Sequence, residues 1–348
     1  MDYLHGTWAT MKSQEDLIRF SRKALGLTQS ISIELAPLEG RGSDRTFYRL
    51  TWDRKDSAIL IHYDPKRVEN TYYADIAIFL RSIDVPAPRL IRHDPAGCLI
   101  AMEDLGDTDL WSLRNAPWKT RRTLYQKTLT IIYKLHCFPE EDFPFARVRL
   151  MEGFGPDLYR WERDYFRDYF VRNVCGIELE PSVERELEVE LSGLAERLIR
   201  TKRSFIHRDL QSQNVMIRDG EPFLIDIQGM RFGSLFYDLG SLLCDPYINF
   251  SSNEREELLA FYYGLLKRDI DWVTFQSTFW ETSAQRLMQA LGAYGFLGLK
   301  KGLKAFFEHI PAGVQNLHLA ASQVASLPCL QELAVGCQRV IEQKGGHS

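Results

Sequence analysis

Short apolar runs separated by turn residues dominate the first hundred positions and predict β-strands. They are rich in the β-branched, aromatic and aliphatic residues that strands favour. The predicted strands cover 33–36, 46–52, 57–63, 89–92 and 98–102. Two stretches in the same region have helical spacing instead, at 12–25 and 66–82. Ser13 is a candidate N-cap for the first helix, and Gly26 ends it.

Beyond Asp104 the apolar residues recur mainly at helical intervals. A β-rich segment with an inserted helix, followed by a helical segment, predicts an α+β protein with two lobes. We expect a helical extension over 1–29, a β-rich lobe over 30–103 and a mainly helical lobe over 104–348. The helices predicted in the last lobe cover 120–136, 156–174, 182–200, 235–244, 253–268, 271–305 and 329–343.

The composition is that of an ordinary globular protein, with 45% hydrophobic and 26% charged residues, and a length of 348 residues supports two lobes. A net charge of -4 disfavours a nucleic-acid surface. No charge-free apolar run approaches the roughly 20 residues of a membrane-spanning helix, and no signal-peptide pattern occurs. The six cysteines are scattered, without the spacing of a zinc site or a disulfide framework. We therefore expect a cytoplasmic protein whose partners include neither a nucleic acid nor a membrane.

Residues 204–231 interrupt the helical pattern with short apolar runs that carry polar residues at their ends. These polar residues are His207, Asp209, Asn214 and Asp226, and an Asp-Gly step at 219–220 predicts a turn between two strands. Two carboxylates and one amide on neighbouring loops suit phosphoryl transfer from ATP. One group orients the acceptor hydroxyl, and two oxygen ligands hold Mg²⁺ against the phosphates.

The same motifs resemble a known family. His-Arg-Asp-Leu-Gln-Ser-Gln-Asn at 207–214, Ile-Asp-Ile-Gln at 225–228 and Phe-Tyr-Asp-Leu at 236–239 resemble the aminoglycoside-phosphotransferase/choline-kinase branch of the protein-kinase-like fold. Further segments resemble the cell-wall amino-sugar kinases within it, the anomeric kinases of N-acetylmuramate and N-acetylglucosamine. They cover 42–49, 99–106, 237–247 and 285–292.

The resemblance implies a role for each polar residue of the interrupted stretch. Asp209 would accept the hydrogen bond of the acceptor hydroxyl and orient it for in-line attack. Asn214 and Asp226 would bind Mg²⁺. His207 would be a structural residue of the catalytic loop, and Asp238 a carboxylate that supports this loop.

For the nucleotide, the turn over 39–45 could cover the phosphates with backbone N–H groups, with Gly40, Gly42 and Ser43 as its contacts. Without the downstream motif the same turn would be a plain hairpin. Main-chain groups near Met102 and Glu103 would contact the adenine edge.

The third predicted strand, at 57–63, lacks the lysine that protein kinases carry there. Arg49 or His62 could replace this lysine, or the phosphates could rely on metal and backbone. Without this lysine, Glu69 on the following predicted helix has no evident partner.

Candidate acceptor contacts lie in the helical lobe, at Asp157, Trp161, Glu162, Gln285 and Arg286. The last two could equally belong to a solvated helix face. We expect an ATP- and Mg²⁺-dependent kinase of a small polar metabolite, with N-acetylmuramate or N-acetylglucosamine as acceptor. The alternatives are a kinase of an aminoglycoside, choline or homoserine, and a nucleotide-binding regulator without catalysis.

Overall fold

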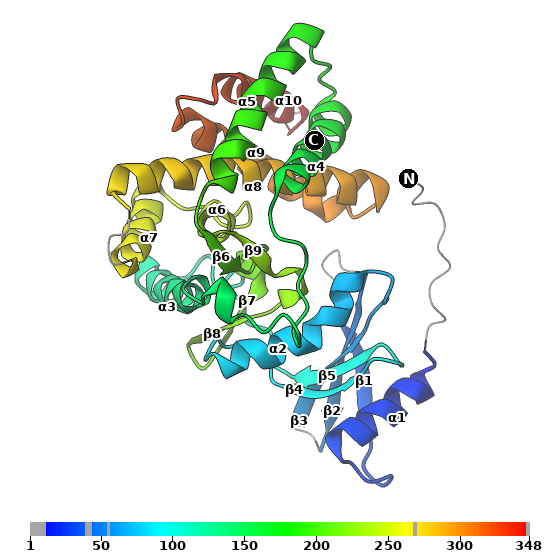
Figure 1. Ribbon diagram of the computed structural model, residues 1–348. Coiled ribbons are helices and arrows are strands. Elements are labelled where there is room, and N and C mark those ends of the chain that lie inside the picture. The colour runs from blue at the N-terminus through cyan, green and yellow to red at the C-terminus, as the bar shows by residue number, and fades with distance from the viewer. Residues whose placement is uncertain (1–11, 39–43, 54–55, 267–269, 346–348) are drawn as a thin grey trace. The chain divides into compact units, whose positions relative to one another are not determined.

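The computed structural model describes residues 12–38, 44–53, 56–266 and 270–345. The chain divides into two compact units (Figure 1). The first unit contains Met1–Asp107, Pro144–Met151 and Phe223–Gly229, and the second contains the three remaining segments, Thr108–Phe143, Glu152–Pro222 and Met230–Ser348. This division differs from the expected one, because residues on both sides of the expected lobe 30–103 belong to the first unit.

The first unit is built on an antiparallel sheet with the strand order β1-β2-β3-β5-β4. The five strands match the five that the apolar runs predict. Their bounds are β1 Glu34–Leu38, β2 Thr46–Trp52, β3 Asp56–His62, β4 Leu90–Asp94 and β5 Leu99–Glu103.

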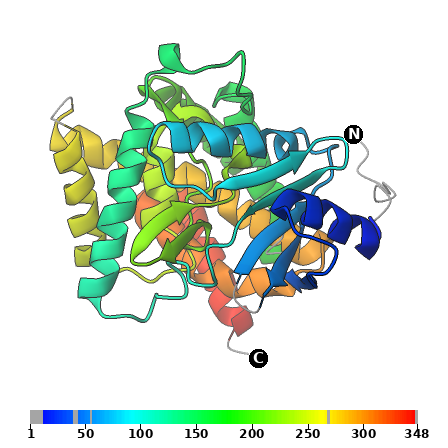
Figure 2. The same ribbon diagram turned by 90° about the horizontal axis from the view of Figure 1, so that it is seen from below.

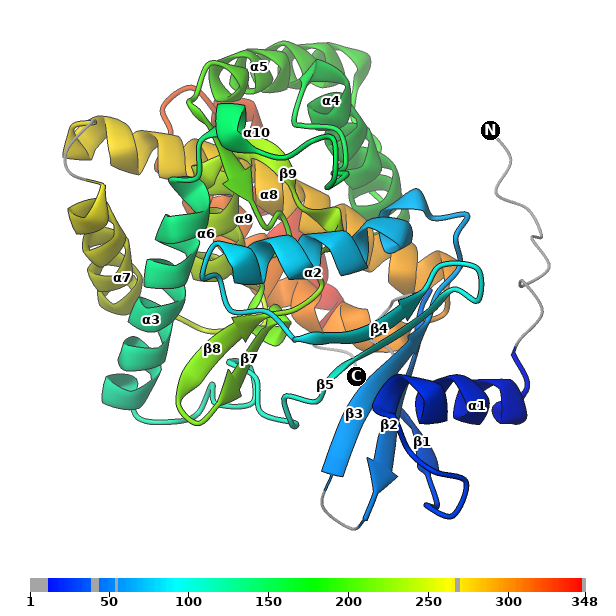
Figure 3. The same ribbon diagram turned by 60° about the horizontal axis from the view of Figure 1, so that its bottom comes forward.

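Helix α1, Gln14–Leu25, packs against this sheet and is not a separate extension (Figure 3). Ser13 accepts a hydrogen bond from the Asp16 N–H, and Gly26 ends the helix at φ 67°, as predicted. Leu17 and Phe20 of α1 join a buried cluster. Because alternate strand residues share one face of a sheet, the cluster includes Leu50, Leu60 and Ala101 from three adjacent strands.

The segment Phe223–Gly229 belongs to the first unit through both its backbone and its packing. The Leu224 N–H donates to the Pro86 carbonyl over 2.9 Å. The 3₁₀ turn Ile227–Gly229 packs against α2, Tyr73–Ser82, and the 3₁₀ turn Val68–Tyr72 before it. Asp226 is therefore held by the unit that contains the sheet.

The second unit is mainly helical and is organised around α8, Trp272–Lys300 (Figure 1). This helix packs against α4, Pro156–Tyr165, and the π-helix Phe166–Cys175 that continues α4. A side chain at Gly295 would lie 2.5 Å from the Tyr169 carbonyl oxygen, so glycine permits this close backbone approach. The other helices are α3 Trp118–His136, α5 Pro181–Ile199, α6 Leu235–Leu243, α7 Ser252–Leu265, α9 Ile310–Ser322 and α10 Pro328–Gly345.

Two short sheet elements frame the stretch with the predicted chemistry. β6, Arg203–Ile206, pairs antiparallel with β9, Arg231–Ser234. β7, Val215–Arg218, and β8, Glu221–Leu224, flank a turn in which Asp219 and Gly220 have φ of 55° and 75°. Sequence analysis did not predict β9, whose arginine, glycine and serine give no strand pattern, nor α9. Elsewhere in the second unit α3 and α7 lie side by side (Figure 2).

Candidate active site

The loop after β6 is held by the carboxylate of Asp238, which is fully buried in α6. The backbone N–H groups of His207 and Arg208 each donate to this carboxylate over 2.7 Å. His136 Nε2 lies 3.1 Å from the same group. Arg208 has φ 77°, a left-handed conformation that costs free energy in a non-glycine residue, and these bonds offset that cost. These are the contacts that a supporting role for Asp238 requires, and His207 is fully buried within the loop.

Asp209 lies between two arginines. It forms an ion pair with Arg208, and Arg286 Nη2 from α8 lies 3.5 Å from its Oδ1. Burial alone would raise the pKa of Asp209, but the charges of Arg208 and Arg286 and the hydrogen bond from Arg208 outweigh it and lower the pKa to about 2. The carboxylate is thus ionised at neutral pH and can accept a hydrogen bond from a hydroxyl group.

Asn214 is tied to Asp209 through its side chain, because its Nδ2 donates to the Asp209 carbonyl over 2.9 Å. The amide oxygen is the remaining side-chain atom that could bind a cation. Asn214 is partly exposed, and amide and carboxylate oxygens are the hard ligands that Mg²⁺ prefers. Among the described residues no group of three or more His, Cys, Asp or Glu could hold a metal ion.

A second buried carboxylate, that of Asp245, holds the far end of the same loop. It accepts hydrogen bonds from the Ser212 N–H at 2.7 Å, the Ser212 hydroxyl at 2.6 Å and the Tyr247 N–H at 3.0 Å. Burial raises the pKa of Asp245 to about 6, against the effect of these donors. Sequence analysis assigned no role to Asp245. The available signal was an aspartate seven residues after Asp238 in an otherwise apolar stretch.

The five candidate acceptor contacts do not form one surface. Glu162 and Gln285 are fully buried and bonded to each other over 2.9 Å, and Tyr237 donates to Glu162 over 2.6 Å. Both side chains are thus occupied by contacts within the helix packing, and direct acceptor contact by Glu162 and Gln285 stays a prediction. Of the other three, Arg286 reaches Asp209, whereas Asp157 and Trp161 are exposed on α4.

In the first unit, the carboxylate of Asp226 interacts with Arg45 and Gln228. Arg45 Nη2 forms an ion pair with Asp226 Oδ1, and Gln228 Nε2 donates to the same oxygen over 3.0 Å. Arg45 Nη1 donates to Gln228 Oε1 over 2.8 Å, which closes a ring of three side chains. Asp226 also has a positive φ, 60°. Sequence analysis did not connect Arg45 with Asp226, since no local pattern relates residues 181 positions apart.

Arg49, a candidate replacement for the strand lysine, is held by two carboxylates. Its Nε lies 2.7 Å from Asp104 Oδ2, and its Nη2 lies 2.7 Å from Asp107 Oδ1. The carboxylate of Glu69, which seemed to lack a partner, lies 3.1 Å from Arg67 Nη2. Arg49 is therefore already paired with carboxylates, and Glu69 has Arg67 as its partner. Neither observation indicates a cation that is kept available for the nucleotide phosphates.

Met102 and Glu103 lie at the end of β5. Met102 is buried, and its sulfur accepts a hydrogen bond from Tyr73 over 3.2 Å. The Glu103 N–H donates to the Arg89 carbonyl over 2.9 Å. This N–H is thus already bonded, and contact with adenine by neighbouring main-chain groups stays a prediction. Three predicted phosphate contacts, Gly40, Gly42 and Ser43, lie outside the described residues.

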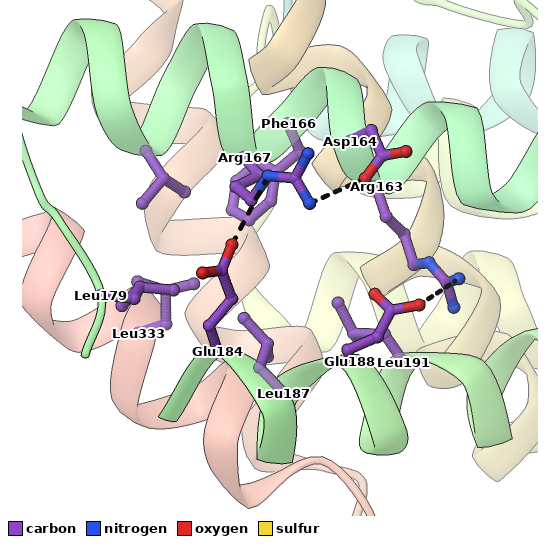
Figure 4. A pocket seen from close by; sticks show the side chains of 11 residues that line it. Arg163, Asp164, Phe166, Arg167, Leu179, Glu184, Leu187, Glu188, Leu191 and Leu333 are labelled. Carbon is purple, nitrogen blue, oxygen red and sulfur yellow. Dashed lines mark hydrogen bonds and ion pairs between the residues drawn. The ribbon is translucent and has the colours of Figure 1, made fainter. Parts of the chain in front are cut away.

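A small pocket lies elsewhere in the second unit, between α4 with its π-helix, α5 and α10 (Figure 4). Its charged residues neutralise one another: Arg163 pairs with Glu188 over 3.3 Å and Arg167 with Asp164 over 2.9 Å. The rest of the lining is largely leucine and phenylalanine. None of its lining residues belongs to the predicted site.

Small-molecule kinases are among the solved structures with a similar fold. A choline/ethanolamine kinase family protein from Mesorhizobium loti superposes with a TM-score of 0.61 at 15% identity, covering 93% of this chain and 99% of that one. An ADP-bound aminoglycoside phosphotransferase, APH(2'')-Ib, gives 0.55 at 11% identity and covers 89% and 99%. The chain thus has the protein-kinase-like α+β fold with two lobes that the sequence predicted.

Curated relatives agree with this class. The N-acetylmuramate/N-acetylglucosamine kinase of Neisseria meningitidis serogroup B is 21% identical over 299 residues, which cover 84% of this chain and 86% of the relative. A methylthioribose kinase of Pectobacterium atrosepticum is 23% identical over 177 residues, which cover 46% and 43%. The fold and the loop therefore define a kinase that acts on hydroxyl groups of small molecules.

More specifically, the model of the phosphotransferase enzyme family, APH, matches residues 34–274, and the chain belongs to this family. The match includes the whole stretch from β2 to α7 and both loops with predicted chemistry. None of the described helices contains a stretch that is both long and apolar enough to cross a membrane.

Proposed function

We propose that this kinase transfers the γ-phosphoryl group of ATP, with Mg²⁺, to a hydroxyl of an amino sugar. N-acetylmuramate and N-acetylglucosamine are the acceptors to test first. The observation that carries the proposal is an ionised carboxylate, Asp209, whose backbone is bonded to the amide of Asn214. The choice of acceptor is supported by the amino-sugar kinase relative, whose similarity extends over 84% of this chain.

Asp209 would act mainly by orientation. A carboxyl group with a pKa of about 2 is a weak base, so it would take little of the hydroxyl proton before the phosphoryl group has begun to transfer. This suits a loose transition state, in which the nucleophile is positioned more than deprotonated. Arg286 and Arg208 keep the carboxylate charged and limit its rotation.

Asn214 and Asp226 would provide oxygen ligands for Mg²⁺. When bound, the ion neutralises phosphate charge as the bond to the leaving group breaks. Asp238 and Asp245 would hold the loop between them in the geometry that in-line attack needs. The exposed ring of Trp161, stacked on Tyr165, offers an apolar face to a sugar ring, and Asp157 one turn earlier offers a hydrogen-bond acceptor.

The test is an acceptor screen. The purified protein, ATP and Mg²⁺ are incubated with N-acetylmuramate, N-acetylglucosamine, methylthioribose, choline, homoserine and an aminoglycoside, and ADP release is followed. We expect ADP release above the water background with an amino sugar, and ³¹P NMR of the product identifies the phosphorylated position. Asp209→Asn should lower kcat about 10³-fold, while the exposed turn variant Asp219→Asn should keep it.

Two outcomes would change this assignment. Turnover with another acceptor but with no amino sugar would leave a small-molecule kinase of different specificity. Methylthioribose is the second candidate, because a methylthioribose kinase also matches part of the chain. ATP binding without turnover on any acceptor would favour a nucleotide-binding regulator.

A further inference from the structure

Arg45 is a nearly buried cation beside the predicted metal ligand of the first unit. It immediately precedes β2, and 8% of its side chain is exposed. Its guanidinium contacts both Asp226 and Gln228, and its Cζ lies 5.3 Å from the centre of the Phe47 ring. Tyr73 donates a hydrogen bond to Met102 on β5. Burial raises the pKa of Tyr73, and the nearby charges of Arg45 and Asp226 also act on this pKa. Arg45 thus lies where β2, α2 and the Asp226 segment meet within one unit.

In this ring of three side chains, Gln228 is a second donor to Asp226 beside Arg45. Gln228 donates to the same carboxylate oxygen that Arg45 contacts. Gln228 is neutral and buried, and it lies only two residues from Asp226. If Arg45 turned away, the hydrogen bond from Gln228 would still orient the carboxylate, and Asp226 could exchange its ion pair with Arg45 for a bound cation.

The two other residues considered as replacements for the strand lysine, His62 and Arg49, are less suited to the phosphates. The strand residues of β3 that sequence analysis compared with the lysine position include no cation except His62, and burial lowers the pKa of His62. Arg49 is paired with Asp104 and Asp107, both outside the predicted metal site. Arg45, in contrast, has as its partner the carboxylate that would bind the metal.

We propose that Arg45 takes the place of the missing strand lysine and exchanges partners when nucleotide binds. Before binding, its guanidinium neutralises Asp226. In the complex, Asp226 binds the divalent cation and Arg45 pairs with a nucleotide phosphate, so each charge keeps an opposite partner. The planar guanidinium fits two phosphate oxygens as well as it fits a carboxylate. This inference rests on the proposed function, because it requires a nucleotide that binds with a metal ion.

If this exchange occurs, one substitution should weaken the binding of ATP and tighten the binding of a divalent cation. General damage to the site would weaken the binding of both. In Arg45→Gln, ATP binding in EDTA, measured by calorimetry, should weaken about 10-fold or more, since a charge-assisted contact to phosphate is lost. Mn²⁺ binding without nucleotide, measured from the EPR signal of free Mn²⁺, should tighten several-fold, because Arg45 no longer competes for Asp226. Arg45→Lys keeps the charge and should retain most of the ATP affinity.

Arg19→Gln is the matched control. It removes an arginine of the same unit whose partner, Asp16, lies on the exposed side of α1. Both affinities should stay at the wild-type values in this variant. If Arg45→Gln does not fold, as judged by its melting curve, Arg45→Met gives the same test, since it also removes the charge and keeps a long unbranched side chain.

Unchanged ATP affinity in EDTA, or Mn²⁺ binding that is unchanged or weaker, in the Arg45 variant without the charge overturns the exchange. If the wild-type protein binds nucleotide and this uncharged variant matches it, the Arg45 assignment alone fails. If the wild-type protein binds no nucleotide at all, the proposed function fails and this inference fails with it.

Discussion

The side-chain nitrogen of Asn214 donates a hydrogen bond to the backbone carbonyl of Asp209 over 2.9 Å. This bond links the predicted metal ligand to the residue that would orient the acceptor. One residue would therefore have two separable tasks: its oxygen binds the metal, and its nitrogen holds the catalytic loop.

Substitutions of Asn214 should separate these tasks. Asn214→Asp keeps an oxygen ligand but loses the donor, so kcat should fall about 10-fold or more while the Mg²⁺ concentration for half-maximal rate changes little. Asn214→Ala loses both groups, and its Mg²⁺ requirement should rise about 10- to 100-fold. Initial rates measured against Mg²⁺ at saturating ATP give both quantities. The same Mg²⁺ requirement in the two variants would argue against the metal-binding task.

Arg286 should set the pH range in which Asp209 is ionised. Because the charge of Arg286 helps to lower the pKa of Asp209, its removal in Arg286→Gln should raise that pKa. The acid limb of kcat/KM should then move to higher pH, with the smallest loss of rate at alkaline pH. Rates are measured from the lowest pH at which the protein stays folded up to pH 9; the variant should lose rate at acid pH values at which the wild type, with a pKa of about 2 for Asp209, does not.

Two variants serve as controls for this shift. Arg286→Lys keeps the positive charge and should keep the wild-type profile. Arg197→Gln removes a partly buried arginine of the same unit that pairs with Glu281 over 2.7 Å, and it should not move the limb. A parallel loss of rate at every pH in Arg286→Gln would point to a packing role alone.

Asp245 should make stability depend on pH. Its pKa is about 6 in the folded protein and 3.8 as the reference value, so between these values the folded state binds more protons than the unfolded state. The free energy of unfolding therefore falls as pH rises through this window, and the stabilisation is fully present below the lower value. Two pKa units correspond to about 3 kcal/mol.

Comparison with Asp245→Asn isolates this contribution. The stability of the wild type relative to this variant should decrease by about 2 kcal/mol between pH 4 and 6.5, because part of the change occurs below pH 4. Urea unfolding at closely spaced pH values measures the difference, and Asp219→Asn serves as the exposed control. A difference that stays constant with pH would show that Asp245 is ionised throughout.

Arg49 should contribute more to the stability of the first unit than to nucleotide binding. Arg49→Gln breaks the pair with Asp104, whose side chain is only 6% exposed, and should cost about 1–3 kcal/mol of stability. ATP affinity should remain within about threefold of the wild-type value, as it should in the exposed β4 variant Arg92→Gln. A large loss of affinity at unchanged stability would return Arg49 to the nucleotide site, as the sequence first suggested.

Local patterns in the sequence predicted most of the strands and the place of the loops that carry the candidate residues. Asp209 and Asn214 lie five residues apart between apolar strands, so their proximity follows from chain geometry alone. The turn at Asp219 and Gly220 has the same origin, because an Asp-Gly step favours the left-handed conformations that both residues adopt.

Contacts between segments that are far apart in the sequence could not be predicted from such local patterns. Glu162 and Gln285 are polar residues on helices, and such residues are usually exposed, but the close packing of α8 with α4 buries both. Their burial depends on a helix crossing that involves residues more than 100 positions apart. The pairing of Arg45 with Asp226 was hidden for the same reason, whereas the Arg67 partner of Glu69 was near in sequence and was overlooked.

The first unit is assembled from three segments that lie far apart in the sequence, and this has a consequence for its folding during translation. Its sheet is complete once residue 103 has been made, but its third segment ends at Gly229. A ribosome must therefore translate α3, α4 and α5 before the Leu224 N–H can reach Pro86 and Asp226 can reach Arg45. Until then the ion pair between Arg45 and Asp226 cannot form, and neither can the proposed metal-binding half of the nucleotide site.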